Sequence, residues 1–164
     1  MVPEKEFVDL LNRHQNIIHK ICHVYMDDPH DREDLFQEIT LQAWKTFRHF
    51  RGDARFSTWL YRVALNTAIT FFRKEKKKIT AYTHQIPDDT GEPNPVEEQV
   101  QAMYRAISGL SKIDKALVML YLEDYSYKEM AAMLGITVTN VGAKMNRIRT
   151  RLKQEIEKHY HPTN

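Results

Sequence analysis

The chain has 164 residues, enough for one ordinary domain or two small ones. Its formal net charge is only +2, so bulk charge does not by itself indicate a nucleic-acid-binding protein. Cys22 is the only cysteine, which excludes an intrachain disulfide and a zinc site built from several cysteines. No apolar stretch near the start has the length of a signal peptide or a membrane span, so we expect a cytoplasmic protein.

Charge is segregated along the chain. The acidic block contains Asp27, Asp28, Asp31, Glu33, Asp34 and Glu38, and the basic block contains Arg73, Lys74, Lys76, Lys77 and Lys78. Opposite charges on separate segments predict two different partners on different surfaces.

Apolar residues recur at helical spacing in the first half of the chain, and strand-like alternation is absent. We expect one helix over residues 7–25 and a second from about 31 to 47, separated by a break at Pro29. A loop at 50–56 follows, and Ser57 is placed to cap a third helix that runs into the lysines.

Between residues 79 and 95 the composition changes. Prolines and a glycine interrupt any helix, and the acidic residues have no matching cations, which is typical of a flexible acidic linker. Helical spacing resumes near Val96. The sequence therefore predicts an all-α protein of two small helical domains, residues 1–78 and 96–164, joined by the linker at 79–95, the second domain carrying a helix-turn-helix.

The segment 126–151 has the spacing of a helix-turn-helix. Ser126 and Glu129 match a capping box, in which each side chain binds the backbone amide of the other. Gly135 stands where the chain must turn, because a residue without Cβ tolerates positive φ. Every charged side chain from 137 to 154 is cationic. Because the second helix of this motif enters the DNA major groove, the segment predicts binding to duplex DNA.

Two stripes divide the last helix. Apolar residues at steps of three and four predict the buried stripe: Val138, Val141, Met145, Ile148, Leu152 and Ile156. The outward stripe carries amide and cationic groups that can contact base edges and phosphates: Asn140, Lys144, Arg147 and Arg151. The alternative is a solvated basic face on a helical bundle, which leaves the coincidence of spacing, cap and charge unexplained.

The segment 50–78 interleaves aromatic rings with cations. Such a surface suits unpaired DNA bases, because rings stack on bases while cationic groups follow the backbone. The alternative is that most rings belong to the core, which we expect for Phe71, with Trp59 half packed. Arg62 and Asn66, four residues apart, share a polar face and are better candidates for DNA contacts.

The acidic segment 31–45 has two explanations. Acidic residues in the first turn of a helix complement the helix macrodipole, which is a purely structural role. Gln37, Glu38 and Gln42 extend the polar face beyond that turn, however, and a surface that docks another protein explains them better.

His19 and His23 have a spacing that can bind zinc, but no glutamate lies between them as it does in the zinc-protease motif. We expect two surface histidines, no metal site and no cofactor. A glycine-rich phosphate loop and a nucleophile elbow are both absent from the sequence, which argues against an enzyme.

Together these segments resemble the sigma-70 family of bacterial transcription initiation factors, in its small extracytoplasmic-function (ECF) class. Residues 31–74 resemble the domain that binds core RNA polymerase and opens the promoter −10 element. Residues 122–153 resemble the domain that recognises the −35 element. The resemblance covers nearly the whole chain, with the two motifs in the expected order.

The resemblance implies three sets of contact residues. The set implied for core polymerase is Asp31, Asp34, Leu35, Gln37, Glu38 and Trp44. The set implied for the −10 element is Arg51, Gly52, Asp53, Arg55, Phe56, Ser57, Trp59, Arg62, Asn66 and Arg73. The set implied for the −35 element is Thr139, Asn140, Ala143, Lys144, Arg147 and Arg151.

The resemblance also implies partners and a mechanism. Core RNA polymerase, promoter DNA and an anti-sigma factor are the expected partners, and trapping of flipped −10 bases is expected to open the promoter without ATP. Gly142 stands where the family usually has a basic residue, which lets the backbone approach DNA more closely.

Two other interpretations remain. A DNA-binding regulator that never contacts polymerase leaves the segment 50–78 without a purpose. A metal-dependent hydrolase built around His19 and His23 predicts bound metal after purification.

Overall fold

The computed structural model describes residues 3–75 and 95–159. These residues form eight α-helices and no strand, which confirms the predicted all-α class. The chain divides into two compact units, Met1–Ile79 and Thr80–Asn164, which we call domain 1 and domain 2. The predicted linker at 79–95 lies outside the described residues, apart from its last position.

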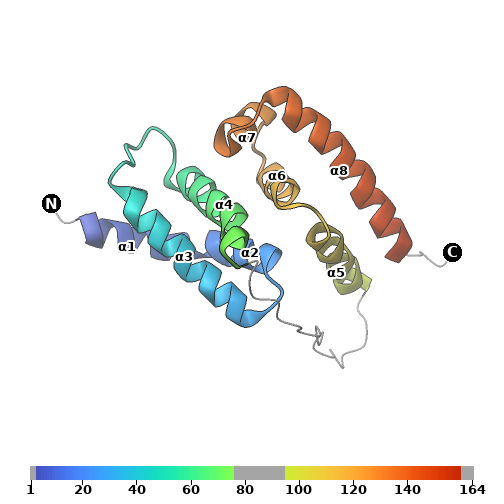
Figure 1. Ribbon diagram of the computed structural model, residues 1–164, viewed down its shortest axis with the longest axis horizontal. Helices are drawn as coiled ribbons and strands as arrows, with labels where there is room; N and C mark the ends of the chain where they lie inside the picture. Colours follow the sequence, from blue (N-terminus) through green and yellow to red (C-terminus); the bar gives the residue numbers. More distant parts are fainter. Residues whose placement is uncertain (1–2, 76–94, 160–164) are drawn as a thin grey trace. The chain divides into compact units, whose positions relative to one another are not determined.

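Domain 1 consists of α1 (Pro3–Arg13), α2 (Gln15–Tyr25), α3 (Pro29–Phe47) and α4 (Phe56–Glu75). Helices α2, α3 and α4 pack against one another, and α1 packs against α2 (Figure 1). The fully buried side chains at the centre are Ile18, Ile21, Leu35, Ile39, Leu60 and Leu65. They come from the apolar faces of all three packed helices, so burial of these faces drives the fold.

The expected single helix over residues 7–25 is wrong, because the chain breaks at His14 between α1 and α2. His14 has φ −118° and ψ 16°, outside the helical region. Its Nδ1 atom lies 2.8 Å from the carbonyl oxygen of Leu10, and its ring packs on Phe56 with centroids 5.1 Å apart. Neither glycine nor proline stands at the break, so only this tertiary packing marks it.

Two helix starts also differ from expectation. Helix α3 begins at Pro29, where the fixed φ of proline suits the first helical position, and Asp28 caps it by accepting a hydrogen bond from the amide of His30. Helix α4 begins at Phe56, so Ser57 lies inside the first turn and is not the cap.

Domain 2 consists of α5 (Pro95–Ser108), α6 (Lys112–Leu122), α7 (Tyr127–Leu134) and α8 (Val138–His159). The long helix α8 packs against the other three, as Figure 1 shows. The core of domain 2 contains Leu117, Leu120, Met130, Val141 and Met145. The domain therefore holds the outer face of α8 on a rigid support.

Candidate nucleic-acid interface

The turn between α7 and α8 has the geometry that the sequence predicts. The Ser126 hydroxyl accepts a hydrogen bond from the amide of Glu129 at 3.1 Å, and the Glu129 carboxylate accepts one from the amide of Ser126 at 3.2 Å. Gly135 adopts φ 70° and ψ 35°, and its amide donates to the Ala131 carbonyl at 2.9 Å. The capping box and the left-handed glycine are both confirmed, and they set the direction in which α8 leaves the turn.

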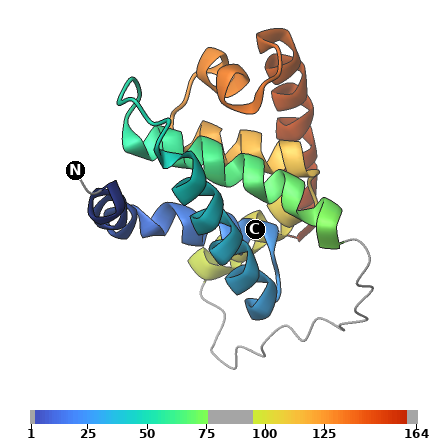
Figure 2. The same ribbon diagram turned by 60° about the vertical axis from the view of Figure 1, so that its left-hand side comes forward.

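Helix α8 presents a polar outer face, and Figure 2 shows its start lying next to α7. Thr137, a capping residue that sequence reasoning missed, accepts a hydrogen bond from the amide of Asn140 at 3.1 Å. Of the residues expected to meet the −35 element, Thr139, Asn140, Ala143, Arg147 and Arg151 are exposed and Lys144 is half-buried.

The buried stripe of α8 follows the prediction only in part. Val141, Met145 and Ile148 are buried, whereas Leu152 and Ile156 are half-buried. Val138 was expected in this stripe, but its side chain, at the first residue of α8, is 48% exposed. It therefore adds an apolar group to the exposed end of α8 that carries Thr139 and Asn140.

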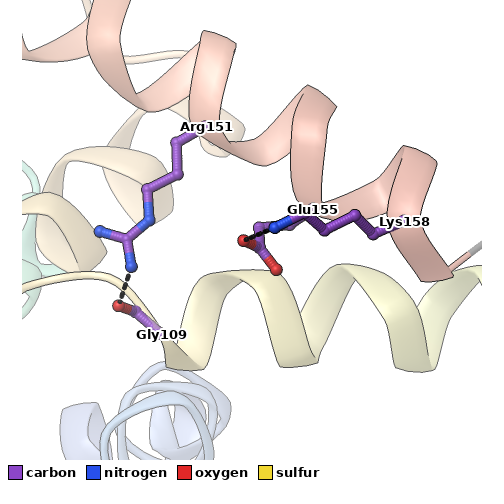
Figure 3. A network of polar contacts seen from close by, with 4 residues as sticks. All are labelled: Gly109, Arg151, Glu155 and Lys158. Atoms are coloured by element: carbon purple, nitrogen blue, oxygen red, sulfur yellow. Dashed lines mark hydrogen bonds and ion pairs between the residues drawn. The ribbon is translucent and has the colours of Figure 1, made fainter.

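Arg151 makes a hydrogen bond within domain 2. Its Nη2 atom donates to the carbonyl of Gly109 at 2.9 Å, across the interface between α8 and the end of α5 (Figure 3). A turn further along α8, the exposed Lys158 and the half-buried Glu155 form an ion pair at 3.8 Å. The bond to Gly109 positions the side chain of Arg151. Because a guanidinium has five N–H donors, the others stay available for a second partner.

Arg149 belongs to a separate contact between α8 and its neighbours. Its Nη2 atom donates to the hydroxyl of Tyr127 at 3.2 Å, and its guanidinium lies 5.1 Å from the ring centroid of Tyr121. A Cβ atom built at Gly142 would lie 4.0 Å from the ring of Tyr127, which is an ordinary contact. Helix packing therefore does not require glycine at this position.

In domain 1, α3 carries an exposed stripe at helical spacing. Asp34, Gln37 and Trp44 of the expected polymerase-binding set lie on it, and Leu41, 44% exposed, completes it. Sequence reasoning missed Leu41, although its spacing from Gln37 and Trp44 places it on that face. Leu41 and Trp44 lie one helical turn apart, so the stripe presents two large exposed apolar side chains next to each other, and contiguous exposed apolar area is typical of a protein-binding surface.

Three other residues of that set lie elsewhere. Leu35 is fully buried in the core, so its direct contact with polymerase is a wrong prediction; its side chain is needed to hold α3 against α2 and α4. Asp31 and Glu38 are half-buried.

The loop between α3 and α4 stands on a cluster of aromatic rings. Phe47, Phe50, Phe56 and Trp59 lie with ring centroids 5.4 to 6.4 Å apart. Such pairs add about 0.5–1.5 kcal/mol each beyond the burial of their area. The cluster fixes both ends of the loop, which projects from α3 and α4 (Figure 2), and residues 51–55 of the loop are exposed.

The residues expected to meet the −10 element differ in exposure. The exposed ones are Arg51, Gly52, Asp53, Arg55 and Arg62, while Ser57, Trp59 and Asn66 are half-buried. Phe56 is only 8% exposed, so its direct contact with DNA is a wrong prediction, because its ring is taken up by the aromatic cluster. Arg73 lies on the last turn of α4, beyond the side chains that the structure describes.

A groove of about 460 Å³ runs between α3 and α4. Its α3 wall carries Glu38, Gln42 and Thr46, and its α4 wall carries Trp59, Arg62, Val63, Asn66, Thr67, Thr70 and Phe71. Sequence reasoning missed this groove because it placed Glu38 on the polymerase face and Arg62 on the DNA face. The structure brings the two side chains to one site.

The two histidines of α2 have different surroundings. His19 stacks on Phe36 with ring centroids 4.8 Å apart, and burial next to Arg32 lowers the pKa of His23. No group of three or more potential metal ligands is found within residues 3–75 and 95–159. Over the same ranges, no helix combines the length and apolar character that crossing a membrane requires.

Comparison with known families identifies the class. Residues 10–78 match the family model Sigma-70 region 2, and residues 100–152 match Sigma-70, region 4. The first match covers domain 1 and the second covers the helix-turn-helix of domain 2. The chain belongs to the sigma-70 family of RNA polymerase sigma factors, in the ECF class.

Relatives along nearly the full length support this placement. The chain is 26% identical to the ECF RNA polymerase sigma factor SigW of Bacillus subtilis, with 92% of this chain and 88% of the relative covered. It is 28% identical to the ECF RNA polymerase sigma-E factor of Escherichia coli, with 94% and 88% covered.

The fold matches solved structures of the same class. The sigma factor RpoE from Bartonella quintana, solved in complex with the anti-sigma factor NepR, superposes with a TM-score of 0.72 at 19% identity, covering 93% of this chain and 98% of that one. CnrH, solved in complex with the cytosolic domain of CnrY, gives a TM-score of 0.65 at 20% identity, covering 94% and 90%.

Proposed function

We propose that this chain binds core RNA polymerase and directs it to promoters whose −35 and −10 elements it recognises. The observation that carries this proposal is the presence, on one chain, of a helix-turn-helix with a polar recognition face and of a second domain with a protein-binding stripe beside a polar groove. Family membership supports the same function. The factor acts in the cytoplasm, and polymerase carries out the phosphoryl chemistry, so the factor itself is not an enzyme.

Polymerase docks on the exposed stripe of α3. Asp34 and Gln37 supply polar contacts, and Leu41 and Trp44 supply apolar area. Trp44, 42% exposed, also packs on Phe7 at 5.2 Å between ring centroids, so its ring is held ready for contact. Asp31 at the start of α3 extends the surface.

The outer face of α8 reads the −35 element in the major groove. Asn140 and Arg147 offer amide and guanidinium groups suited to base edges, and Lys144 offers a cation for phosphate. The exposed Val138 suits the methyl group of thymine. Thr139 and Ala143 allow close approach of the helix, and Arg151 adds phosphate contact from the position that Gly109 sets.

Domain 1 reads and opens the −10 element. The exposed loop residues Arg51, Gly52, Asp53 and Arg55, with Ser57 at its base, accept a flipped base. Trp59, Arg62, Asn66 and Arg73 continue the contact along α4. Capture of unstacked bases offsets an unstacking cost of a few kcal/mol, so opening needs no ATP.

The decisive test is complex formation with core polymerase. We expect the purified chain to comigrate with core polymerase on gel filtration and to give promoter-dependent run-off transcripts. Absence of both would refute the proposal. Tight duplex binding by the chain alone would favour a regulator that acts without polymerase, because each domain of a two-domain reader binds weakly by itself.

Arg147→Ala tests the −35 surface. Loss of one base-contacting guanidinium is expected to weaken the −35 footprint of the polymerase complex by about 1–3 kcal/mol. Lys153→Ala is the matched control, because Lys153 is also an exposed cation of α8 but lies outside the proposed contact set. Equal footprints for the two variants would remove Arg147 from the interface.

An anti-sigma factor is a further proposed partner. The solved complex of RpoE with NepR shows that a sigma factor of this fold binds such a protein. Coverage of the α3 stripe would block polymerase, which gives a simple means of control.

A further inference from the structure

The turn between α2 and α3 is crossed by a hydrogen bond. Met26, which ends α2 in extended conformation with φ −126° and ψ 133°, is only 6% exposed. Its carbonyl accepts a hydrogen bond at 2.7 Å from Nε of Arg32, which lies at the end of the first turn of α3. Within residues 3–75 and 95–159, Arg32 is the only donor to this carbonyl. Because a buried carbonyl without a donor is costly, the bond ties the start of α3 to the end of α2.

A second polar contact at this turn is local. Asp28 caps α3 by accepting a hydrogen bond from the amide of His30 at 3.1 Å. Such a cap fixes the residue at which the helix begins, because its two partners lie two positions apart. It does not fix the direction in which α3 leaves the turn. The bond from Arg32 to Met26 spans six positions and joins the two helices, so it constrains that direction.

The charge of Arg32 is directed toward α2. Partial burial, and after it the charge of Arg32, lowers the pKa of His23. Burial raises the pKa of the Cys22 thiol to about 12, an effect that the charge of Arg32 opposes. Both residues belong to the last turn of α2, so the guanidinium lies near the end of that helix.

The acidic residues next to Arg32 do not receive its charge. Arg32 is the only lysine or arginine between residues 27 and 38, and it forms no ion pair within the part of the chain that the structure describes. Glu33 and Asp34 are exposed, and over the same described ranges neither carboxylate is in an ion pair. The start of α3 therefore presents carboxylates whose charge is not offset, which suits a cationic partner surface.

We propose that Arg32 is a positioning residue for polymerase docking. Its bond to Met26 holds the first turns of α3 against the end of α2, and this orientation places Asp34 and Gln37 at the beginning of the exposed α3 stripe. The bond also keeps the guanidinium away from the carboxylates that polymerase is proposed to contact. The inference rests on the proposed function and adds a residue that acts through the helix that polymerase binds.

Arg32→Met and Arg32→Gln form a matched pair. Both remove the charge and keep an unbranched side chain, but only glutamine carries an N–H donor on the atom that corresponds to Nε of arginine. Loss of one ordinary hydrogen bond lowers the fraction of correctly oriented protein, and with it the apparent affinity for core polymerase, by about 3- to 10-fold. We expect this loss in Arg32→Met and recovery of most of the affinity in Arg32→Gln, when core polymerase is titrated with the full chain.

Three controls separate this role from more general ones. Alkylation of the buried Cys22 reports whether domain 1 stays folded, and it should be no faster in either variant than in the unaltered protein. Arg13→Met removes the same charge from an exposed position of α1 outside the proposed contact sets, and it should leave the affinity unchanged. The pKa of His23, measured by NMR, should rise in both Arg32 variants because a nearby positive charge is lost.

Each contrary result has one meaning. Unchanged affinity in Arg32→Met, or an unchanged pKa of His23, overturns the inference and leaves the proposed function standing. An equal loss in Arg32→Met and Arg32→Gln, a gain in both, or a similar loss in Arg13→Met assigns the effect to charge and also overturns it. Faster alkylation of Cys22 in Arg32→Met makes Arg32 a general stabiliser of domain 1 and not a positioning residue. If the unaltered chain binds no polymerase, the proposed function itself fails, and the inference with it.

Discussion

The two domains build their DNA-binding surfaces in different ways. Domain 2 places its proposed −35 face on one helix, whose start is set by short-range features: the capping box at Ser126, the left-handed Gly135 and the Thr137 cap. Domain 1 presents its proposed −10 surface on a loop and on α4, held by the aromatic cluster of residues 47–59, on which His14 packs from a distant part of the chain.

The difference fits what each domain is proposed to bind. A helix that enters the major groove of a rigid duplex needs only a fixed direction, which short-range hydrogen bonds can supply. A site for unpaired bases must enclose them from several sides, so it requires residues that are distant in sequence and are brought together by packing. The stability of the two surfaces should therefore respond to different substitutions.

Phe56→Ala is expected to have the largest effect. Removal of this buried ring should destabilise domain 1 by about 3–5 kcal/mol, a large part of the stability of a small domain. Cys22 is the only cysteine and lies on α2, so its alkylation reports on domain 1 alone. It is 3% exposed, and burial raises the pKa of its thiol to about 12, so it should resist alkylation until the domain opens.

We expect Cys22 to be alkylated much faster in Phe56→Ala than in the unaltered protein, while hydrogen exchange in α6–α8 stays unchanged. Phe56→Leu is the control, since it keeps most of the apolar volume and should label at an intermediate rate. Equal labelling of all three proteins would show that the cluster does not support domain 1.

Gly135→Ala and Gly142→Ala form a matched pair in domain 2. The first places a Cβ at φ +70° and should cost about 1–2 kcal/mol. The second adds a Cβ in open helix, where alanine is favoured over glycine by roughly 0.5–1 kcal/mol. Urea unfolding of domain 2 should therefore shift in opposite directions. A loss of stability in Gly142→Ala would mean that the contact with Tyr127 is tighter than 4.0 Å.

The same contrast explains what could be predicted from the sequence. The capping box and the turn at Gly135 were predictable because their causes lie within a few residues. The break at His14 was not, since apolar spacing continues through it and only packing on Phe56 marks the site. The groove was missed for the same reason: Glu38 and Arg62 line one groove only after α3 and α4 pack.

Exposure was the other limit. Family resemblance assigned contacts to Leu35 and Phe56, and both are buried. The helical spacing of Leu35 with Ile39 already indicated the inward face of the helix, so for this residue the resemblance was followed against the spacing. Leu41 and Val138 were missed because an apolar residue in a helix is expected inside, yet both are more than 40% exposed, at 44% and 48%.

Ser126→Ala is expected to have a smaller effect than Gly135→Ala. Loss of the hydroxyl removes one half of the capping box and should cost domain 2 about 1 kcal/mol. Ser126→Thr retains the acceptor oxygen and serves as the control, with most of the stability kept. If both variants unfold at the same urea concentration, the cap does not contribute to the stability of the turn.

Tyr127→Phe should have the smallest effect and tests whether domain 2 depends on local devices alone. The hydroxyl of Tyr127 accepts a hydrogen bond from Arg149, 22 residues away, at an exposed site where such a bond is worth about 0.5 kcal/mol. A double-mutant cycle with Arg149→Gln isolates the coupling from the contribution of Tyr121, whose ring also contacts the guanidinium. A coupling of about 0.5 kcal/mol would show that a tertiary contact joins the two helices of the motif. A coupling of zero would mean that the turn and the buried core alone set the angle between α7 and α8. Domain 2 would then depend on short-range interactions and its core, without this tertiary hydrogen bond.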